Sequence, residues 1–336
     1  MDIAQKTREW RNVDLATFRN EIVPQYRPAI LKGLVRDWPA VRDGSRSPQA
    51  LCDYVMRFDQ GRETVAFVGP PEIKGRYFYR DDMKGVNFTQ VRERFATTIE
   101  RLRSQIGVAG APSIYVGSAP IPDSLPGLAG ELPLDLVDPA VVPRIWIGGP
   151  SVVAPHYDLS DNIACVVGGR RRFTFFPPEQ VKNLYVGPLE FTLAGQPCSM
   201  VSVKEPDFAR FPKFREALAA AEVADLAPGD AVYIPYLWWH GVESFDPVNM
   251  LINYWWTDAQ SGNPAAFEAL VHAILAVRSN PPERRAAWKA IFDHYIFEAN
   301  GDPMAHFPPQ HRGILGRMSP PLADFIRSWL KSAINR

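Results

Sequence analysis

A histidine and an aspartate lie two residues apart in the largely apolar stretch VVAPHYDLSDN, residues 152–162. If this segment is extended, the side chains of His156 and Asp158 point to the same face, because side chains alternate along a strand. An imidazole and a carboxylate that converge on one point suit a metal ion. The pair therefore predicts a metal site, and a third ligand is expected elsewhere in the chain.

The six histidines limit the choice of the third ligand. Only His156 and His240 lie in the region of strand patterns, and the others lie in a C-terminal region of helical pattern: His272, His294, His306 and His311. Two imidazoles and one carboxylate on one face of an octahedron leave three positions open, as in non-haem Fe(II) oxygenases. A histidine beside tryptophans, such as His240 in YLWWHGV, is more often a packed core residue. The joint occurrence of both histidines with Asp158 favours the metal site.

Short strand patterns separated by Gly and Pro fill residues 113–257, the region that must position these ligands. The segments SIYVGS, RIWIGG, NIACVV, RFTFFPP, CSMVSV, DAVYIP and NMLINYWW predict strands, and such a series is typical of a sandwich or barrel. NIACVVGGRRRFTFFPP predicts a hairpin that turns at Gly168 and Gly169. A helix is expected within FARFPKFREALAAAEVADL, before the next strand.

Mixed elements are predicted upstream of this region, and helices downstream. Helices are expected over residues 14–26, with Asp14 as N-cap and Pro24 as a stop, and over 49–58 and 89–106. AILKGLV, TVAFVG and RYFYRDD predict strands. After residue 263, the patterns PAAFEALVHAILAVRS, PPERRAAWKAIFDHYIFE and PLADFIRSWLKSAI predict helices.

The composition excludes several classes of function. The 336 residues carry no net charge, so nothing indicates a nucleic-acid or anionic-membrane partner. The N-terminus is polar, and no run approaches the roughly 20 apolar residues of a membrane span. The three cysteines, Cys52, Cys165 and Cys198, form neither a CxxC pair nor an even framework. We therefore expect a cytoplasmic protein.

The stretches APHYDLSDNIACVVGGRRRFTFFPP, PGDAVYIPYLWWHGVES and NYWW resemble the JmjC/cupin-like family of Fe(II)- and 2-oxoglutarate-dependent oxygenases. Well-known relatives are protein hydroxylases of the factor-inhibiting-HIF type. RPAILKGLVRDWPA and GRYFYRDDMKGVNF are also similar to cupin-like members, so the resemblance covers roughly residues 14–257. It implies a mainly β fold with a double-stranded β-helix core, also called a jelly roll or cupin, N-terminal α/β elements and a C-terminal helical segment. The expected domains are α/β elements over 1–112, a catalytic barrel over 113–260 and a helical region over 261–336.

The resemblance also implies roles for individual residues. His156, Asp158 and His240 match the iron ligands of the family. Asn162, six residues after the first ligand, and Asn253 in INYWW match asparagines near the metal-binding end of 2-oxoglutarate. The oxo acid end of this cosubstrate occupies two of the three open metal positions.

The distal carboxylate of the cosubstrate requires a cation and a hydroxyl donor. Tyr115 in SIYVG matches the tyrosine whose hydroxyl binds this carboxylate in the family. Many relatives have Ser or Thr three residues before the first ligand as a further donor. Val153 occupies that position here and cannot donate, so one hydrogen bond worth about 1 kcal/mol is lost.

The family usually pairs this carboxylate with a lysine, and Arg171 occupies the lysine position. Arg can form a bidentate pair with a carboxylate and stays charged when buried. Strand alternation places Arg171 on the face of Phe173 and Phe175, and places Arg170 and Arg172 on the other face. Arg171 is therefore the predicted partner, and Arg170 or Arg172 could share the task.

The resemblance implies a dioxygenase that uses Fe(II), 2-oxoglutarate and dioxygen to hydroxylate a protein or peptide side chain, releasing succinate and CO2. A small-molecule hydroxylase is the near alternative. A cupin-type isomerase or other metal enzyme without 2-oxoglutarate, or a binding module, remains open. The tryptophans Trp238, Trp239, Trp255 and Trp256 are expected mostly to pack, with one or two lining a substrate groove. The C-terminal helices of relatives form a homodimer, which is also expected here.

Overall fold

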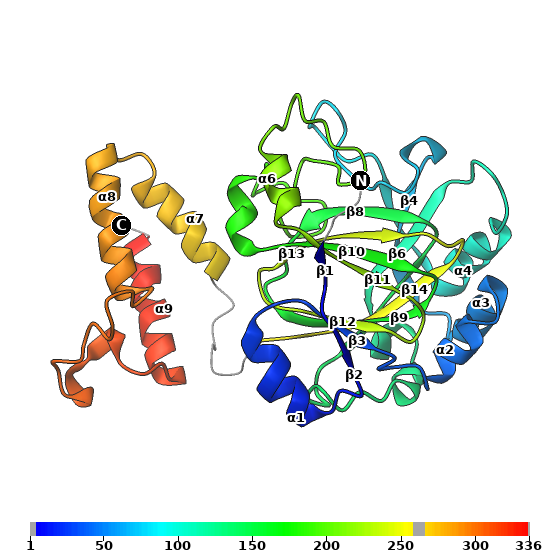
Figure 1. The fold of residues 1–336 in the computed structure, drawn as a ribbon, viewed down its shortest axis with the longest axis horizontal. Helices are drawn as coiled ribbons and strands as arrows, with labels where there is room; N and C mark the ends of the chain where they lie inside the picture. Colours follow the sequence, from blue (N-terminus) through cyan, green and yellow to red (C-terminus); the bar gives the residue numbers. More distant parts are fainter. Residues whose placement is uncertain (1–4, 258–265, 335–336) are drawn as a thin grey trace. The chain divides into compact units, whose positions relative to one another are not determined.

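The chain divides into two units, residues 1–256 and 257–336, and all the described strands lie in the first unit. The structure is a computed structural model that describes residues 5–257 and 266–334 (Figure 1). The described strands are β1 (Gln5–Lys6), β2 (Glu9–Arg11), β3 (Ala29–Lys32), β4 (Glu63–Gly69), β5 (Thr89–Arg94), β6 (Ser113–Pro120), β7 (Pro143–Gly148), β8 (Ser151–His156), β9 (Asp161–Gly168), β10 (Arg171–Phe176), β11 (Glu222–Leu226), β12 (Ala231–Ile234), β13 (Trp239–Ser244) and β14 (Asn249–Trp256).

These strands form two sheets. The smaller sheet has the order β1-β11-β10-β13-β8, and the larger has the order β2-β3-β12-β9-β14-β7-β6-β4-β5. Helices accompany them in the same unit: α1 (Leu15–Thr17), α2 (Pro39–Gly44), α3 (Pro48–Met56), α4 (Phe95–Ser104), α5 (Ile121–Ser124) and α6 (Phe214–Ala219).

An apolar core joins the two sheets face to face. Phe173 and Phe175 of β10 contribute from the smaller sheet, and Val166 of β9 and Leu251 of β14 from the larger. Strand-forming residues bury one face of each sheet in this way, since neither sheet alone can remove its apolar face from water. The predicted mainly β fold with a jelly-roll core is confirmed, and the site lies between its sheets.

A second core covers the outer face of the larger sheet. On β9, Ile163, Cys165 and Val167 point into it, together with apolar residues of α2, α3 and α4, whereas Ala164 and Val166 point between the sheets. Both faces of β9 are therefore buried, which explains why NIACVV is a continuous apolar run without alternation.

The predicted hairpin at Gly168 and Gly169 is wrong. β9 pairs with β12 and β14, whereas β10 pairs with β11 and β13, so the turn leads from one sheet to the other. Gly169 adopts a φ of +72°, and the Arg170 N–H donates to the Asp246 carboxylate at 2.7 Å. Strands adjacent in sequence were expected to pair, but the barrel closes by placing them in facing sheets.

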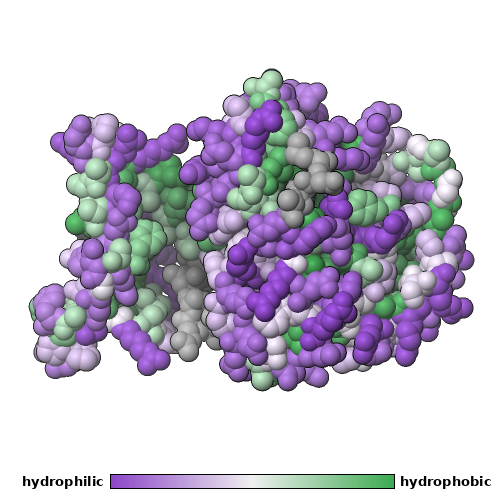
Figure 2. Space-filling view, in the orientation of Figure 1, coloured by the Kyte–Doolittle hydropathy of each residue, from purple (hydrophilic) through white to green (hydrophobic). Residues whose placement is uncertain are grey.

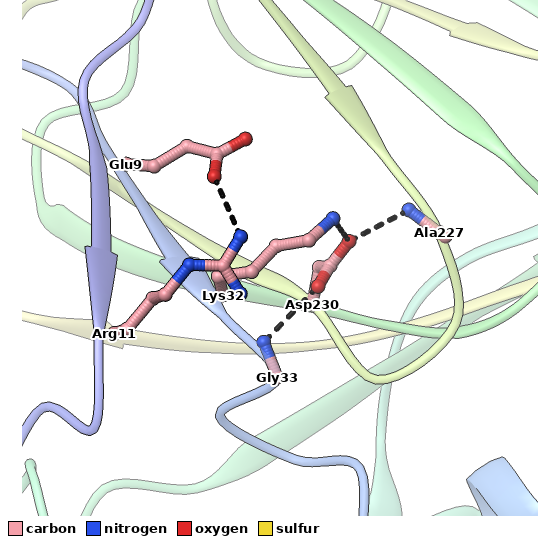
Figure 3. A network of polar contacts seen from close by, with 6 residues as sticks. All are labelled: Glu9, Arg11, Lys32, Gly33, Ala227 and Asp230. Carbon is pink, nitrogen blue, oxygen red and sulfur yellow. Dashed lines mark hydrogen bonds and ion pairs between the residues drawn. The ribbon is translucent and has the colours of Figure 1, made fainter.

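Asp230 fixes the turn between β11 and β12. Its carboxylate accepts from the Lys32 ammonium at 2.7 Å and from the backbone N–H groups of Gly33 and Ala227 at 3.0 Å each (Figure 3). These bonds tie the turn to the end of β3. Because β12 pairs in turn with β9, the turn helps to place Asn162, which is opposite Ile234.

Three upstream and loop predictions differ from the structure. Residues 89–106, expected to form one helix, form β5 followed by α4. The prediction failed because an exposed edge strand and an exposed helical turn have the same polar composition. RYFYRDD and CSMVSV form isolated bridges in place of strands. Their side chains pack instead in a small cluster around Phe78, Tyr79 and Cys198.

The first predicted helix is present, but its winding changes along its length. The Asp14 carboxylate accepts from the Thr17 N–H at 2.7 Å, as expected of the N-cap. The chain is α-helical over Leu15–Thr17, π-helical over Phe18–Ile22 and 3₁₀-helical over Val23–Gln25. Pro24 lies within the last turn, so the helix ends just after it.

The C-terminal unit contains the three predicted helices, α7 (Ala266–Val277), α8 (Pro282–Tyr295) and α9 (Pro320–Ile334). None of their described side chains is buried, and Figure 2 shows hydrophobic residues at the surface of this unit. The predicted boundary at 260–261 lies outside the described residues. Among the described helices, none is long and apolar enough to span a membrane.

Candidate metal and cosubstrate site

His156, Asp158 and His240 come together between the sheets. Each offers a ligand atom, and these atoms lie within 4.8 Å of one another. His156 ends β8, Asp158 follows two residues later, and His240 on β13 is directly opposite His156 in the register. No other group of three such side chains occurs in the part of the chain that the structure describes.

Backbone carbonyls fix the protonation of both imidazoles. The Nδ1 atoms of His156 and His240 lie 3.0 Å from the carbonyl oxygens of Ala154 and Trp238. A carbonyl only accepts, so each Nδ1 carries the proton and each Nε2 keeps a lone pair for a metal. Burial, followed by the nearby His156, lowers the pKa of His240 to about 4, against the opposing effect of Asp158. His240 is therefore neutral at neutral pH, as a metal ligand must be.

An indole N–H orients the carboxylate of the cluster. Trp255 Nε1 donates to Asp158 Oδ2 at 3.1 Å, and the same oxygen lies 3.6 Å from His240 Nε2. Trp255 was expected only to pack or to line a groove. The sequence did contain a signal for this position. Trp255 lies two residues after Asn253 on β14, so strand alternation places both side chains on the same face.

The two predicted asparagines form one chain of hydrogen bonds. Trp146 Nε1 on β7 donates to Asn253 Oδ1 at 2.6 Å, and Asn253 Nδ2 donates to Asn162 Oδ1 at 3.2 Å. Both asparagines are buried. The chain fixes the amide orientations and leaves Asn162 Nδ2 as a donor without a partner among the described residues.

Arg171 is a buried cation whose hydrogen bonds are incomplete. The hydroxyl of Tyr115, which lies across the barrel on β6, is near enough to favour the charged form of the guanidinium. Burial lowers the pKa of the Arg171 guanidinium, and burial raises the pKa of Tyr115 to about 12. Arg171 Nε and Nη2 have no hydrogen-bond partner in the part of the chain that the structure describes. No described carboxylate offsets the charge, so the site fits an anion.

The two neighbouring arginines are paired with carboxylates. Arg170 pairs with Asp246 at 2.9 Å, and Arg172 pairs with Asp225 at 2.6 Å. Both are substantially exposed, whereas Arg171 is buried. The alternation that predicts Arg171 as the inward cation therefore agrees with the geometry.

One cavity of about 190 Å³ connects these groups. It is lined by all seven predicted site residues, by Val153 and by the aromatic side chains of Phe67, Tyr77, Phe88, Trp146 and Trp255. Sequence reasoning did not single out Trp146, and it also missed Phe67, Tyr77 and Phe88, although their segments were predicted as strands or resemble cupin-like members. Their rings contact one another and Tyr115 with centroids 5.3–6.4 Å apart, which makes one wall of the cavity largely aromatic.

The remaining predicted tryptophans pack away from the cluster. Trp238 lies in the core between the sheets, and its indole N–H donates to the Tyr26 carbonyl at 2.9 Å. Trp239 packs against Tyr157 with centroids 4.8 Å apart. Tyr157, between the two ligands of the HxD pair, thus points away from the cluster, as strand parity predicts.

Comparison with known proteins assigns the family. The model of the cupin-like domain matches residues 15–262. HSPB1-associated protein 1 of Homo sapiens is 35% identical over 147 residues, 42% of this chain and 30% of that protein. Lysine-specific demethylase 8 of Danio rerio is 27% identical over 252 residues, 72% of this chain and 56% of that protein. Lysine-specific demethylase JMJ31 of Arabidopsis thaliana is 32% identical over 108 residues, 32% of this chain and 19% of that protein.

These matches span only part of the relatives, between 19% and 56% of their own lengths. The matched region nevertheless covers the strands from β3 to β14 and every residue of the candidate site. With the predicted jelly-roll core in place, the chain belongs to the cupin-like domain family, among the JmjC/cupin-like oxygenases that its motifs resemble.

Proposed function

We propose that this chain is an Fe(II)- and 2-oxoglutarate-dependent dioxygenase that hydroxylates a protein or peptide side chain and releases succinate and CO2. One observation carries the proposal. A two-histidine, one-carboxylate cluster and a buried guanidinium without a counter-anion lie in the same cavity. The first suits Fe(II), and the second suits the distal carboxylate of the cosubstrate.

The residues fit both groups chemically. His156, Asp158 and His240 would hold the metal, because two neutral imidazoles and one carboxylate match the ligand preference of Fe(II) and leave coordination positions open. Arg171 and Tyr115 would bind the distal carboxylate. Bound Fe(II) supplies the oxidative chemistry, in which dioxygen and 2-oxoglutarate are consumed together.

The protein itself contributes orientation and a dry cavity. Trp255 holds the Asp158 carboxylate, and the Trp146–Asn253–Asn162 chain presents a free amide donor near the cluster. Apolar and aromatic side chains form most of the lining, so water is largely excluded and each polar contact is strengthened.

A protein substrate is supported by the names of the relatives, which refer to lysine residues of proteins or to a partner protein. An isomerase of the cupin type is less well supported. Such sites more often use three or more histidines, and only two lie in this cavity. A small-molecule hydroxylase with the same site is the alternative. A substrate screen would distinguish it from a protein or peptide hydroxylase.

The test is anaerobic absorbance spectroscopy of the purified protein with Fe(II) and 2-oxoglutarate. We expect a visible metal-to-ligand charge-transfer band that requires both additions and disappears in His240→Ala. His272→Ala, in the C-terminal unit, is the matched control and should keep the band. If the wild-type protein binds iron but gives no band with 2-oxoglutarate, the proposed function is wrong.

We further propose that the chain forms a homodimer through its C-terminal helices and works in the cytoplasm. Apolar side chains on α7, α8 and α9 are exposed, which supports an additional contact surface. The three cysteines are buried and unpaired, which supports a reducing compartment. The domain division given above stays a prediction.

A further inference from the structure

Ser244 faces Arg171 across two neighbouring strands of the smaller sheet. The two residues are directly opposite in the antiparallel pair β10–β13, so their side chains share a face with Cβ atoms roughly 5 Å apart. On β13 this is also the face of His240 and Val242, which line the cavity. Ser244 and Arg171 are each 4% exposed.

Both side chains carry polar atoms without a hydrogen-bond partner among the described residues. Seven buried side-chain polar atoms among the described residues have no partner, and three of them belong to this pair: Arg171 Nε, Arg171 Nη2 and Ser244 Oγ. Phe173, Leu226 and Val242 of the core between the sheets flank the pair, and the buried Ser151 is opposite Ser244 on β8. A buried hydroxyl and a buried guanidinium without partners each cost free energy. Their concentration at one place indicates an acceptor that comes from outside the fold.

The free edge of Arg171 defines the shape of that acceptor. Nε–H and Nη2–H lie side by side on one edge of the planar guanidinium and point in parallel. Two parallel donors match the two oxygens of one carboxylate. The Tyr115 hydroxyl approaches the guanidinium from the opposite sheet.

Ser244 supplies a hydroxyl close to the position where many relatives have one. Val153 replaces that donor on β8 and is opposite Val242 in the register. Ser244 lies on the same strand as Val242, two residues further along and on the same face. The hydroxyl is therefore displaced to the neighbouring strand, beside Arg171.

We propose that Ser244 determines cosubstrate specificity by donating its hydroxyl to the distal carboxylate that Arg171 binds. The inference rests on the proposed function and adds a residue that compensates for Val153. Arg171, Tyr115 and Ser244 together give a dicarboxylate a higher affinity than a 2-oxo acid that lacks the second carboxylate.

The test measures binding by anaerobic titration calorimetry, with Mn(II) in place of iron so that no turnover occurs. The two probes are 2-oxoglutarate and 2-oxobutanoate, which has the same oxo acid end but no distal carboxylate. We expect Ser244→Ala to weaken 2-oxoglutarate binding roughly tenfold, since a hydrogen bond to a charged group is lost. Binding of 2-oxobutanoate should not change.

Ser151→Ala is the matched control. Ser151 is also buried, and it is opposite Ser244 on β8, one strand further from Arg171. It should leave both affinities unchanged. Without ligand, Ser244→Ala should melt at or above the wild-type temperature, because it removes a buried hydroxyl without a partner. A lower melting temperature would indicate a structural role and would contradict the proposal.

The outcomes separate this inference from the proposed function. If the wild-type protein binds 2-oxoglutarate and Ser244→Ala binds it equally well, the role of Ser244 is wrong and the proposed function stands. An equal loss for both probes would also overturn the specificity role. If the Mn(II)-loaded wild type binds neither probe, the proposed function fails, and the role of Ser244 fails with it.

Discussion

Single hydrogen bonds decide how well the candidate ligands are held. The Asp158 carboxylate accepts from Trp255 Nε1 at 3.1 Å, and both imidazoles donate from Nδ1 to carbonyls at 3.0 Å. The two carbonyls are backbone groups, of Ala154 on β8 and of Trp238 just before β13, and cannot be removed by a side-chain substitution. The indole bond can be removed, so it offers the cleanest test of how orientation affects metal affinity.

Trp255→Phe should weaken Mn(II) binding about tenfold, because the carboxylate loses the donor that orients it. Titration calorimetry of the metal-free protein measures this affinity directly. Trp256→Phe is the control, since the neighbouring ring packs against Tyr233 on the outer side of the sheet. An unchanged affinity in Trp255→Phe would show that the indole only fills space.

Arg171 is expected to bind the distal carboxylate of 2-oxoglutarate. Its buried charge is also expected to lower the free energy of unfolding of the ligand-free protein. Replacing it with Met removes a buried charge without a counter-anion, so the free energy of unfolding should rise by about 1–2 kcal/mol. The same variant should lose 2-oxoglutarate binding. Chemical denaturation and calorimetry measure the two effects on one sample.

Arg170→Met serves as the control for this substitution. Arg170 is exposed and pairs with Asp246, so its loss should change stability little and leave cosubstrate binding intact. If Arg171→Met were less stable than the wild type, the guanidinium would have a counter-anion within the folded protein, and the anion-binding interpretation would be contradicted.

At the scale of elements, the connection between β9 and β10 closes the barrel and directs Arg171 inward. Gly169 in this connection has a φ of +72°, and a Cβ there would lie 2.2 Å from Asn249 Oδ1 and 3.0 Å from the Val248 carbonyl oxygen. Gly169→Ala should therefore lower the free energy of unfolding by about 2–4 kcal/mol.

Gly61→Ala isolates the contribution of the clash. Gly61 has the same φ of +72°, but a Cβ added there would meet no atom within 4 Å. It should cost only about 1 kcal/mol, from backbone strain alone. Equal effects of the two substitutions in urea denaturation would show that the turn yields and that the clash contributes nothing.

Sequence patterns located the site better than they located the strand partners. The HxD spacing, His240 and the inward parity of Arg171 all follow from local rules, and the cavity brings these residues together. The partner of β9 does not follow, because a strand buried on both faces has no alternation that identifies its neighbours. The aromatic wall of Phe67 and Tyr77 comes from segments that tertiary packing alone brings to the site.

At the scale of the whole molecule, the C-terminal unit exposes apolar side chains on its helices. Its three helices bury none of their described side chains, and α9 exposes Phe325 by 59% and Trp329 by 55%. These two residues are four apart and so share one side of the helix. An apolar stripe of this kind gains stability when a second surface covers it.

A double substitution of Phe325 and Trp329 with Glu should convert the proposed dimer to a monomer, because dimerisation would then bury two carboxylates without partners. Sedimentation velocity at several protein concentrations measures the association state. Lys331→Glu, on the same helix but away from Trp329, changes the charge without changing the apolar stripe and should remain dimeric. The monomeric variant should still bind Mn(II), since all three candidate ligands belong to the N-terminal unit. A wild-type protein that sediments as a monomer at every concentration would contradict the proposed dimer and leave the site assignment untouched.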